Sequence, residues 1–302
     1  MDSATPASIP KRAPLKWYWR GLRVLLLAYI GILIFLYVFQ RKLIFPGAGT
    51  HGDSASKVTA PPDCELLSLK TAGNINVKAL FGPAFGPDGK IESTPKTRPT
   101  ILFCYGNAMC LHTAMQQFNA FRHMGANVII PEYTGYGLSD GEASESGCYA
   151  AADAAYDHLL TRSDVDPSKI IIAGWSLGGA VAIDLASRKP AAGLASFSSF
   201  TSMAGMGHNL YPFLPTFAIS AILNHRFESI SKIQNVPCPV LIGHGTADPM
   251  IPYRMSDQLA AAATSPVTRL TVDGAGHEDF FSHDGAKVSA AFGEFIEKCC
   301  GK

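Results

Sequence analysis

Short apolar segments alternate with amphipathic or alanine-rich segments along most of the chain. Runs of β-branched and apolar residues bounded by Gly, Pro or Asn are typical of buried strands, and the longer stretches between them have the length of helices. Strands are expected at 66–70, 75–81, 101–105, 127–131, 170–173, 194–200, 239–243 and 268–272. Helices are expected at about 110–123, 145–161, 177–188, 254–263 and 284–299. This alternation predicts an α/β fold whose mostly parallel central sheet has helices on both faces.

One apolar segment near the N-terminus is too continuous for an amphipathic helix. Residues 24–39 carry no charged side chain, and Leu22 extends the run. A helix over 24–39 is ~24 Å long at about 1.5 Å per residue, slightly short of a bilayer core. A buried core helix would show polar positions at helical spacing, and a signal peptide would be shorter and end in a small-residue cleavage site. The segment therefore predicts a retained transmembrane anchor over 22–40.

The charges on the two sides of this anchor predict its orientation. Lysine or arginine stands before it at positions 11, 12, 16, 20 and 23, whereas only Arg41 and Lys42 directly follow it. The positive-inside rule then places the N-terminus in the cytosol and the large C-terminal part on the lumenal or outer side. We expect a single-pass protein of the endoplasmic reticulum or plasma membrane. The absence of an Asn-x-Ser/Thr sequon weighs mildly against a lumenal domain.

Composition divides the rest of the chain. Residues 1–21 read as a polar cytosolic tail, and residues 41–63, with their Gly, Ser and Pro, as a linker. Residues 64–298 are long enough for one large α/β domain. The apolar stretch 211–227 predicts a helix over the sheet edge, which is either part of a short lid over 205–228 or an ordinary packing helix.

Charge and cysteine content argue against a nucleic-acid partner and against a metal site. The net charge of +1 gives no basic excess for a nucleic-acid partner. The seven cysteines show no metal-ligand spacing, and the sequence implies no metal or organic cofactor. For Cys299 and Cys300 at the end of the chain, an exposed, unmodified tail is favoured over acylation or a disulfide. The oligomeric state is left open.

The strongest chemical signal is the pentapeptide Gly-Trp-Ser-Leu-Gly at 174–178, directly after an apolar strand and before an alanine-rich helix. A serine on such a sharp strand-to-helix turn can present its hydroxyl above the sheet as a nucleophile. We expect side chains at positions 174 and 178 to clash with neighbouring backbone, which accounts for the two glycines. Ser176 is therefore the predicted nucleophile.

A serine nucleophile needs a base, usually a histidine oriented by a carboxylate. Asp248 lies in the loop after the strand at 239–243, and His277 lies in the loop after the strand at 268–272. They are the predicted acid and base. Asp273 is a rival acid but shares the loop of the histidine. His277 must be neutral to accept a proton, so activity should fall when it becomes protonated.

Acyl transfer also needs two backbone N–H groups aimed at the developing oxyanion. One is expected from Leu177, the residue after the nucleophile, at a helix N-terminus. The other is expected from Asn107 or Ala108, in the loop that follows the strand at 101–105, where Gly106 permits the turn.

With these motifs in place, the chain resembles the α/β-hydrolase superfamily, and within it the signal-anchored single-pass hydrolase-domain proteins close to the serine-aminopeptidase-like group. The resemblance covers about residues 40–298 and rests on five ordered motifs: Tyr-Gly-Asn-Ala at 105–108, the glycine-rich stretch 132–141, the serine turn, His-Gly-Thr-Ala-Asp at 244–248 and Gly-His at 276–277. Tyr105 departs from the histidine found there in many relatives. The resemblance also implies that His244, which follows a strand near the acid, structures its loop.

The resemblance and the anchor together imply a membrane-bound serine hydrolase. Relatives of this kind include monoacylglycerol and lysophospholipid lipases and protein depalmitoylases, so a long-chain acyl ester or thioester in a lipid or acylated protein is the expected substrate. A serine aminopeptidase is the enzymatic alternative. A non-catalytic, membrane-tethered interaction protein is a further alternative, against which the complete triad argues.

Overall fold

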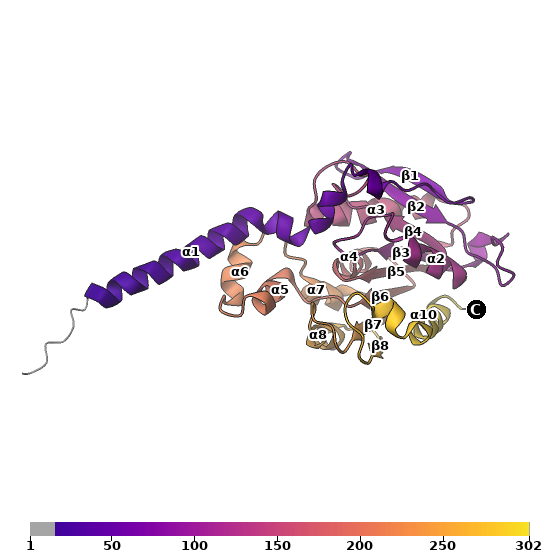
Figure 1. The fold of residues 1–302 in the computed structure, drawn as a ribbon. Helices are drawn as coiled ribbons and strands as arrows, with labels where there is room; N and C mark the ends of the chain where they lie inside the picture. Colours follow the sequence, from indigo (N-terminus) through magenta and orange to yellow (C-terminus); the bar gives the residue numbers. More distant parts are fainter. Residues whose placement is uncertain (1–15, 302) are drawn as a thin grey trace, which may run out of the picture. The chain divides into compact units, whose positions relative to one another are not determined.

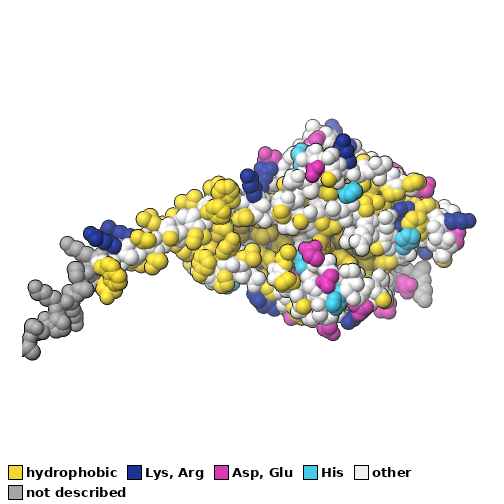
Figure 2. Space-filling model, viewed as in Figure 1, with side chains coloured by type: hydrophobic (Ala, Val, Ile, Leu, Met, Phe, Trp, Pro, Cys, Tyr) yellow, Lys and Arg dark blue, Asp and Glu magenta, His cyan; other side chains and the backbone are white. Residues whose placement is uncertain are grey.

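The computed structural model describes residues 16–301, and the chain divides after Gln40 into two compact units. Helix α1 (Lys16–Ile44) supplies the first unit and runs into the second. It is long and apolar enough to cross a membrane, and none of its most apolar 18-residue window is buried. Figure 2 shows hydrophobic side chains along this helix and basic side chains toward its ends. These features match the predicted anchor in length and composition and exclude a buried core helix.

Within residues 16–301, eight strands form one sheet in the order β1-β2-β4-β3-β5-β6-β7-β8 (Figure 1). Strands β1 and β2 pair antiparallel with each other, as do β2 and β4, and the pairs from β4 to β8 are parallel. The strands are β1 Glu65–Lys70, β2 Asn76–Gly82, β3 Thr100–Cys104, β4 Asn127–Pro131, β5 Ile170–Trp175, β6 Gly193–Phe197, β7 Val240–Gly245 and β8 Val267–Val272. The predicted α/β class with a mostly parallel sheet is confirmed.

The five strands from β4 across to β7 are buried at every residue, because helices cover both faces of the sheet. Helix α4 is buried along its whole length and contacts β3, β5 and β6, which explains its Gly- and Ala-rich sequence. The helices of this part are α2 Met115–His123, α3 Glu145–Thr161, α4 Leu177–Ala186, α5 Met203–Leu210, α6 Thr216–Ile222, α7 Ser229–Lys232, α8 Arg254–Ala262, α9 Phe280–His283 and α10 Gly285–Cys300.

The segment predicted as a linker is instead packed against the α/β domain. Phe45 is 1% exposed and Val58 is 8% exposed, and both belong to the hydrophobic core. The backbone N–H of Gly47 donates to the carbonyl oxygen of Asn107 at 2.9 Å. A linker prediction from Gly, Ser and Pro content alone was wrong for this part, because a few apolar residues are enough to bind it to the domain.

The stretch 211–227 does not form one helix. Helices α5 and α6 form a hairpin, and Pro215 is the N-cap of α6, where the missing proline N–H costs nothing. At the other end of the chain, α10 continues to Cys300, so the prediction of an exposed cysteine tail was wrong. Cys300 is half-buried, its thiol contacts the Lys169 carbonyl oxygen at 3.7 Å, and burial raises its pKa to about 11.

Candidate active site

Ser176 stands between β5 and α4 in a strained backbone conformation. Its φ of 57° and ψ of −121° lie outside the regions that L-residues prefer. A Cβ added to Gly174 would lie 2.0 Å from the Gly178 carbonyl oxygen, and one added to Gly178 would lie 1.9 Å from the Cys104 carbonyl oxygen. A side chain at position 174 or 178 would therefore clash with the neighbouring backbone, as predicted. The turn holds the serine at the carboxyl end of a central strand.

The structure brings together the three side chains of the predicted triad. Nε2 of His277 lies 3.0 Å from Oγ of Ser176, and Nδ1 of His277 lies 2.7 Å from Oδ2 of Asp248. Ser176 follows β5, Asp248 follows β7 and His277 follows β8, three parallel strands whose carboxyl ends share one edge of the sheet. Ser176 and His277 are 7% and 4% exposed, so these hydrogen bonds form largely away from water.

The Asp248 carboxylate accepts hydrogen bonds on both oxygens. Oδ1 accepts from the backbone N–H groups of Met250 and Ile251, both at 2.8 Å. Oδ2 accepts from His277 and lies 3.2 Å from Nε2 of His244. Burial raises the pKa of this carboxyl, but the hydrogen bonds from His244, His277 and Ile251 outweigh it and hold the pKa well below its ordinary value. The group is therefore a stable anion beside His277.

Trp175 covers the His277 ring. The two ring centroids are 5.0 Å apart with an interplanar angle of 30°. A Cβ added to Gly106 would lie 2.7 Å from Cζ3 of the same tryptophan and 3.6 Å from Cβ of Ser176. The loop after β3 thus passes close to the serine only because residue 106 lacks a side chain. Trp175 packs between this loop and the histidine.

The loop after β3 carries Asn107 and Ala108, whose amides are the predicted oxyanion donors. Asn107 is fixed from both sides, because its carbonyl oxygen accepts from the Gly47 N–H and its Nδ2 donates to the Ile44 carbonyl oxygen at 3.1 Å. Leu177 occupies the first position of α4, where backbone N–H groups have no acceptor within the helix. The aim of these amides at an oxyanion stays a prediction.

Tyr105 has a structural role behind this loop. It is fully buried, its hydroxyl accepts from the Tyr133 N–H at 3.2 Å, and the Tyr133 hydroxyl donates to its carbonyl oxygen at 2.8 Å. Burial raises the pKa of both phenols well above the ordinary value. The departure from histidine at this position therefore places an aromatic ring in the core.

Glu132 holds two loops near the site together, a role that was not predicted from the sequence. Its carboxylate is buried and accepts from the Leu111 N–H at 2.9 Å and from the Leu138 N–H at 2.6 Å. Leu111 lies in the segment after β3 that also contains Asn107, so one carboxylate braces that segment against the glycine-rich stretch after β4. Burial raises the pKa of Glu132. The sequence signals for it are its position directly after a buried strand and at the start of the glycine-rich stretch 132–141.

Within residues 16–301 there is no group of three or more His, Cys, Asp or Glu side chains placed to hold a metal ion. Of the other histidines, His244 structures its loop as predicted, with Nε2 2.9 Å from the Ile251 carbonyl oxygen. Asp273, the rival acid, is exposed in the turn after β8. The linked polar side chains at this sheet edge are therefore Ser176, His277, Asp248 and His244.

Sequence comparisons match this architecture. Residues 99–219 match a family model described as the alpha/beta hydrolase fold. An uncharacterized protein of Mycobacterium tuberculosis is 34% identical over 267 residues, which span 88% of this chain and 90% of that protein. Alpha/beta hydrolase domain-containing protein 17C of mouse is 35% identical over 216 residues, which span 71% of this chain and 62% of the mouse protein.

Solved structures agree in fold. An esterase of Pyrococcus furiosus superposes with a TM-score of 0.63 over 81% of this chain and 96% of its own, at 15% identity. A puromycin-hydrolyzing peptidase of M. tuberculosis gives a TM-score of 0.62 over 82% of this chain and 40% of its own, at 21% identity. The mostly parallel sheet, the serine turn and the sequence relatives together show that the chain belongs to the α/β-hydrolase superfamily.

Proposed function

We propose that the protein is a membrane-anchored serine hydrolase that cleaves a long-chain acyl ester or thioester through an acyl-enzyme. The observation that carries the proposal is the chain of two short hydrogen bonds from Asp248 through His277 to Ser176. A neutral imidazole in this position can remove the serine proton, and a buried carboxylate fixes its tautomer and stabilises the imidazolium that forms.

The reaction follows from this geometry in two halves. Oγ of Ser176 attacks the acyl carbonyl carbon while Nε2 of His277 takes the serine proton. The resulting oxyanion accepts hydrogen bonds from the Leu177 N–H and from the N–H of Asn107 or Ala108. The intermediate collapses as His277 gives its proton to the leaving alcohol or thiol. Water, deprotonated by the same histidine, then hydrolyses the acyl-serine and releases the acid.

Two features support an acyl substrate from a membrane. Helix α1 has the length and apolar character of an anchor, which would keep the domain beside a bilayer. The α5–α6 hairpin adds exposed apolar side chains to the domain. Lysophospholipids, monoacylglycerols and palmitoylated cysteines in proteins all carry a long acyl chain on an ester or thioester. They form one substrate class for a single site.

The test of the mechanism is labelling of the purified full chain by a fluorophosphonate probe. Wild-type protein should be labelled and Ser176→Ala should not, whereas Ser289→Ala, which changes an exposed serine on α10, should still be labelled. Equal labelling of wild type and Ser176→Ala would refute the proposal. A panel of a monoacylglycerol, a lysophospholipid, a palmitoyl thioester and an aminoacyl amide then identifies the substrate. Exclusive cleavage of the amide would favour the aminopeptidase alternative.

We further propose that the N-terminus is cytosolic, since basic residues are more numerous before the anchor than after it. The exposed loop around Asp88 offers a test, because Asp88→Asn with Lys90→Ser creates a glycosylation sequon there. Glycosylation in a eukaryotic host would support a lumenal domain. Unglycosylated protein that is digested from the cytosolic side would refute this orientation.

A further inference from the structure

The α5–α6 hairpin exposes large apolar side chains to solvent. Leu210 is 65% exposed, Phe213 is 62% exposed and Phe217 is 77% exposed, and these three residues are here called the hairpin face. Figure 2 shows hydrophobic side chains gathered over this part of the domain. Between residues 203 and 223 the sequence has no Asp, Glu, Lys or Arg. Large exposed apolar side chains gathered on one element indicate an interaction site.

The inner side of the hairpin packs against the rest of the domain. Leu214 is fully buried and Ile219 is 4% exposed, so the hairpin already satisfies its contact with the domain. Nδ1 of His208 lies 2.9 Å from the Leu214 carbonyl oxygen and closes the turn between the two helices. The hairpin face therefore points outward from a folded base, and burying it needs something outside this domain.

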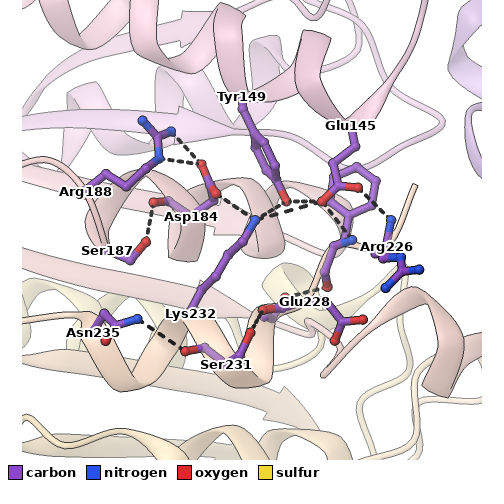
Figure 3. A network of polar contacts seen from close by, with 12 residues as sticks. Glu145, Tyr149, Asp184, Ser187, Arg188, Arg226, Glu228, Ser231, Lys232 and Asn235 are labelled. Atoms are coloured by element: carbon purple, nitrogen blue, oxygen red, sulfur yellow. Dashed lines mark hydrogen bonds and ion pairs between the residues drawn. The ribbon is translucent and has the colours of Figure 1, made fainter. Parts of the chain in front are cut away.

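The end of the hairpin is fixed to the domain by the network in Figure 3. Glu145 accepts from the backbone N–H groups of Arg226 at 2.6 Å and Phe227 at 2.9 Å. Lys232 lies 2.7 Å from Oδ1 of Asp184 and 3.9 Å from Oε1 of Glu145, and so links this end to α4, the helix that begins after Ser176. Such a base holds the hairpin in one orientation.

The start of the hairpin lies beside the nucleophile. Oγ of Ser199 donates to the carbonyl oxygen of Ser176 at 3.0 Å, and Ser202, three residues later, caps α5. The Met203 N–H then donates to the Arg226 carbonyl oxygen at 2.8 Å, which closes the two ends of the hairpin on each other. The hairpin thus rises from the same sheet edge that carries Ser176.

The base of the hairpin also adjoins the point where the chain leaves the long apolar helix. The Phe45 ring lies 4.9 Å from the His225 ring and 6.0 Å from the Phe227 ring, measured between centroids. Phe45 stands only five positions after Gln40, where the first unit ends. A bilayer crossed by the preceding helix is therefore held close to the hairpin by the covalent chain itself. This connection selects a lipid surface as the occupant of the hairpin face.

Charges at the margins of the hairpin fit the same occupant. Arg226 and Arg254 are exposed, and their guanidinium groups donate to Ser220 and Asn209 of the hairpin, both at 3.2 Å. Cations that flank an apolar patch complement the phosphates above the acyl region of a bilayer.

We propose that the hairpin face inserts into the bilayer that holds helix α1, so that an acyl chain passes from the lipid to Ser176 without crossing water. The insertion itself stands on exposure, packing and connectivity. The delivery of an acyl chain rests in addition on the proposed function.

Insertion is tested on the full chain in phosphatidylcholine nanodiscs that contain 5-doxyl phosphatidylcholine, with one protein per disc. Phe217→Trp places a fluorophore on the hairpin face, and Leu160→Trp places one at an exposed leucine of α3 that is 46% exposed. The native tryptophans are accounted for by subtracting the wild-type signal. The doxyl lipid should quench the tryptophan at 217 at least twofold more than that at 160. Equal quenching would overturn the proposal.

Delivery is tested with Leu210→Ser, Phe213→Ser and Phe217→Ser combined, against Leu160→Ser as the matched control. The triple variant should cleave a monoacylglycerol in nanodiscs about tenfold more slowly than wild type. Its cleavage of the water-soluble 4-nitrophenyl acetate and its fluorophosphonate labelling should be unchanged. Equal loss on both substrates, or on neither, would overturn delivery. Quenching at 217 without hydrolysis of any ester by wild type would support insertion and refute the proposed function.

A protein partner predicts different results. If the hairpin face binds a second copy of this chain, the protein should be a dimer in detergent, and the triple variant should be a monomer. That result, together with equal quenching at 217 and 160, would overturn insertion.

Discussion

One oxygen of Asp248 serves two histidines. Oδ2 lies 2.7 Å from Nδ1 of His277 and 3.2 Å from Nε2 of His244, whose Nε2 also lies 2.9 Å from the Ile251 carbonyl oxygen. Because both neighbours of His244 Nε2 are acceptors, this nitrogen carries the proton. His244 is 1% exposed, so its contact with the carboxylate is shielded from water. In the proposed mechanism it is a positioning residue.

Removal of this donor should slow hydrolysis without weakening substrate binding. His244→Ala deletes one buried hydrogen bond to a charged group, worth about 1.5–3 kcal/mol, and kcat should fall about tenfold or more while KM stays within twofold. His244→Gln keeps an amide donor and should recover a large part of the loss. Steady-state kinetics on a soluble ester, with thermal unfolding as a control for folding, measures both. Equal activity of the Ala and Gln variants would contradict the positioning role.

The lowered pKa of Asp248 predicts how stability depends on pH. The folded protein holds this carboxylate charged more readily than the unfolded chain does, whose Asp pKa is about 3.9. Its contribution to the free energy of unfolding is therefore present above about pH 4 and is lost as the pH falls from there toward the lowered pKa. The advantage in Tm of wild type over Asp248→Asn should thus shrink below about pH 4. The exposed Asp273→Asn should follow wild type, and a constant advantage down to pH 3 would contradict the assignment.

The strained backbone at Ser176 should lower the free energy of unfolding of the protein. A φ of 57° with a ψ of −121° is strained for serine and accessible to glycine. Ser176→Gly should therefore be more stable than Ser176→Ala by about 1–2 kcal/mol, although neither should be labelled by a fluorophosphonate. The same pair at Ser289, an exposed position inside α10, should show the opposite order by about 1 kcal/mol. Thermal unfolding of the four variants decides the matter, and the same order at both positions would refute stored strain.

Much of the fold and the meeting of the triad side chains could be predicted because both depend on local patterns. Apolar runs bounded by glycine mark the central strands. Ser176 directly follows β5, and Asp248 and His277 lie in the loops after β7 and β8, so the parallel sheet brings them to one edge. Chain order and strand ends were sufficient here, and no long-range pairing had to be known.

The remainder depends on contacts that a pattern does not contain. The Glu132 carboxylate accepts hydrogen bonds from the amides of Leu111 and Leu138, which come from different loops. The residues next to Glu132 in the sequence do not predict either partner. The packing of residues 44–58 depends on Phe45 and on the hydrogen bonds that Asn107, far away in sequence, makes with Gly47 and Ile44. The stretch 211–227 was predicted as one helix because its apolar run is continuous, but only Thr216–Ile222 of it is helical, after the N-cap Pro215, and α5 lies before it.

Gly47 connects the segment after the long helix to the predicted oxyanion loop. A Cβ added there would lie 2.3 Å from the Asn107 carbonyl oxygen and 2.3 Å from Cε1 of Tyr136, so the backbone at Asn107 has to shift. A displacement of about 1 Å at a donor can cost up to a hundredfold in rate, so Gly47→Ala should lower kcat/KM for a soluble ester by about tenfold to a hundredfold. Gly49→Ala is the matched control, because a Cβ at this position meets nothing within 4 Å. The rate of fluorophosphonate labelling should fall in the same proportion for Gly47→Ala, and equal rates for the two variants would show that this contact does not position the loop.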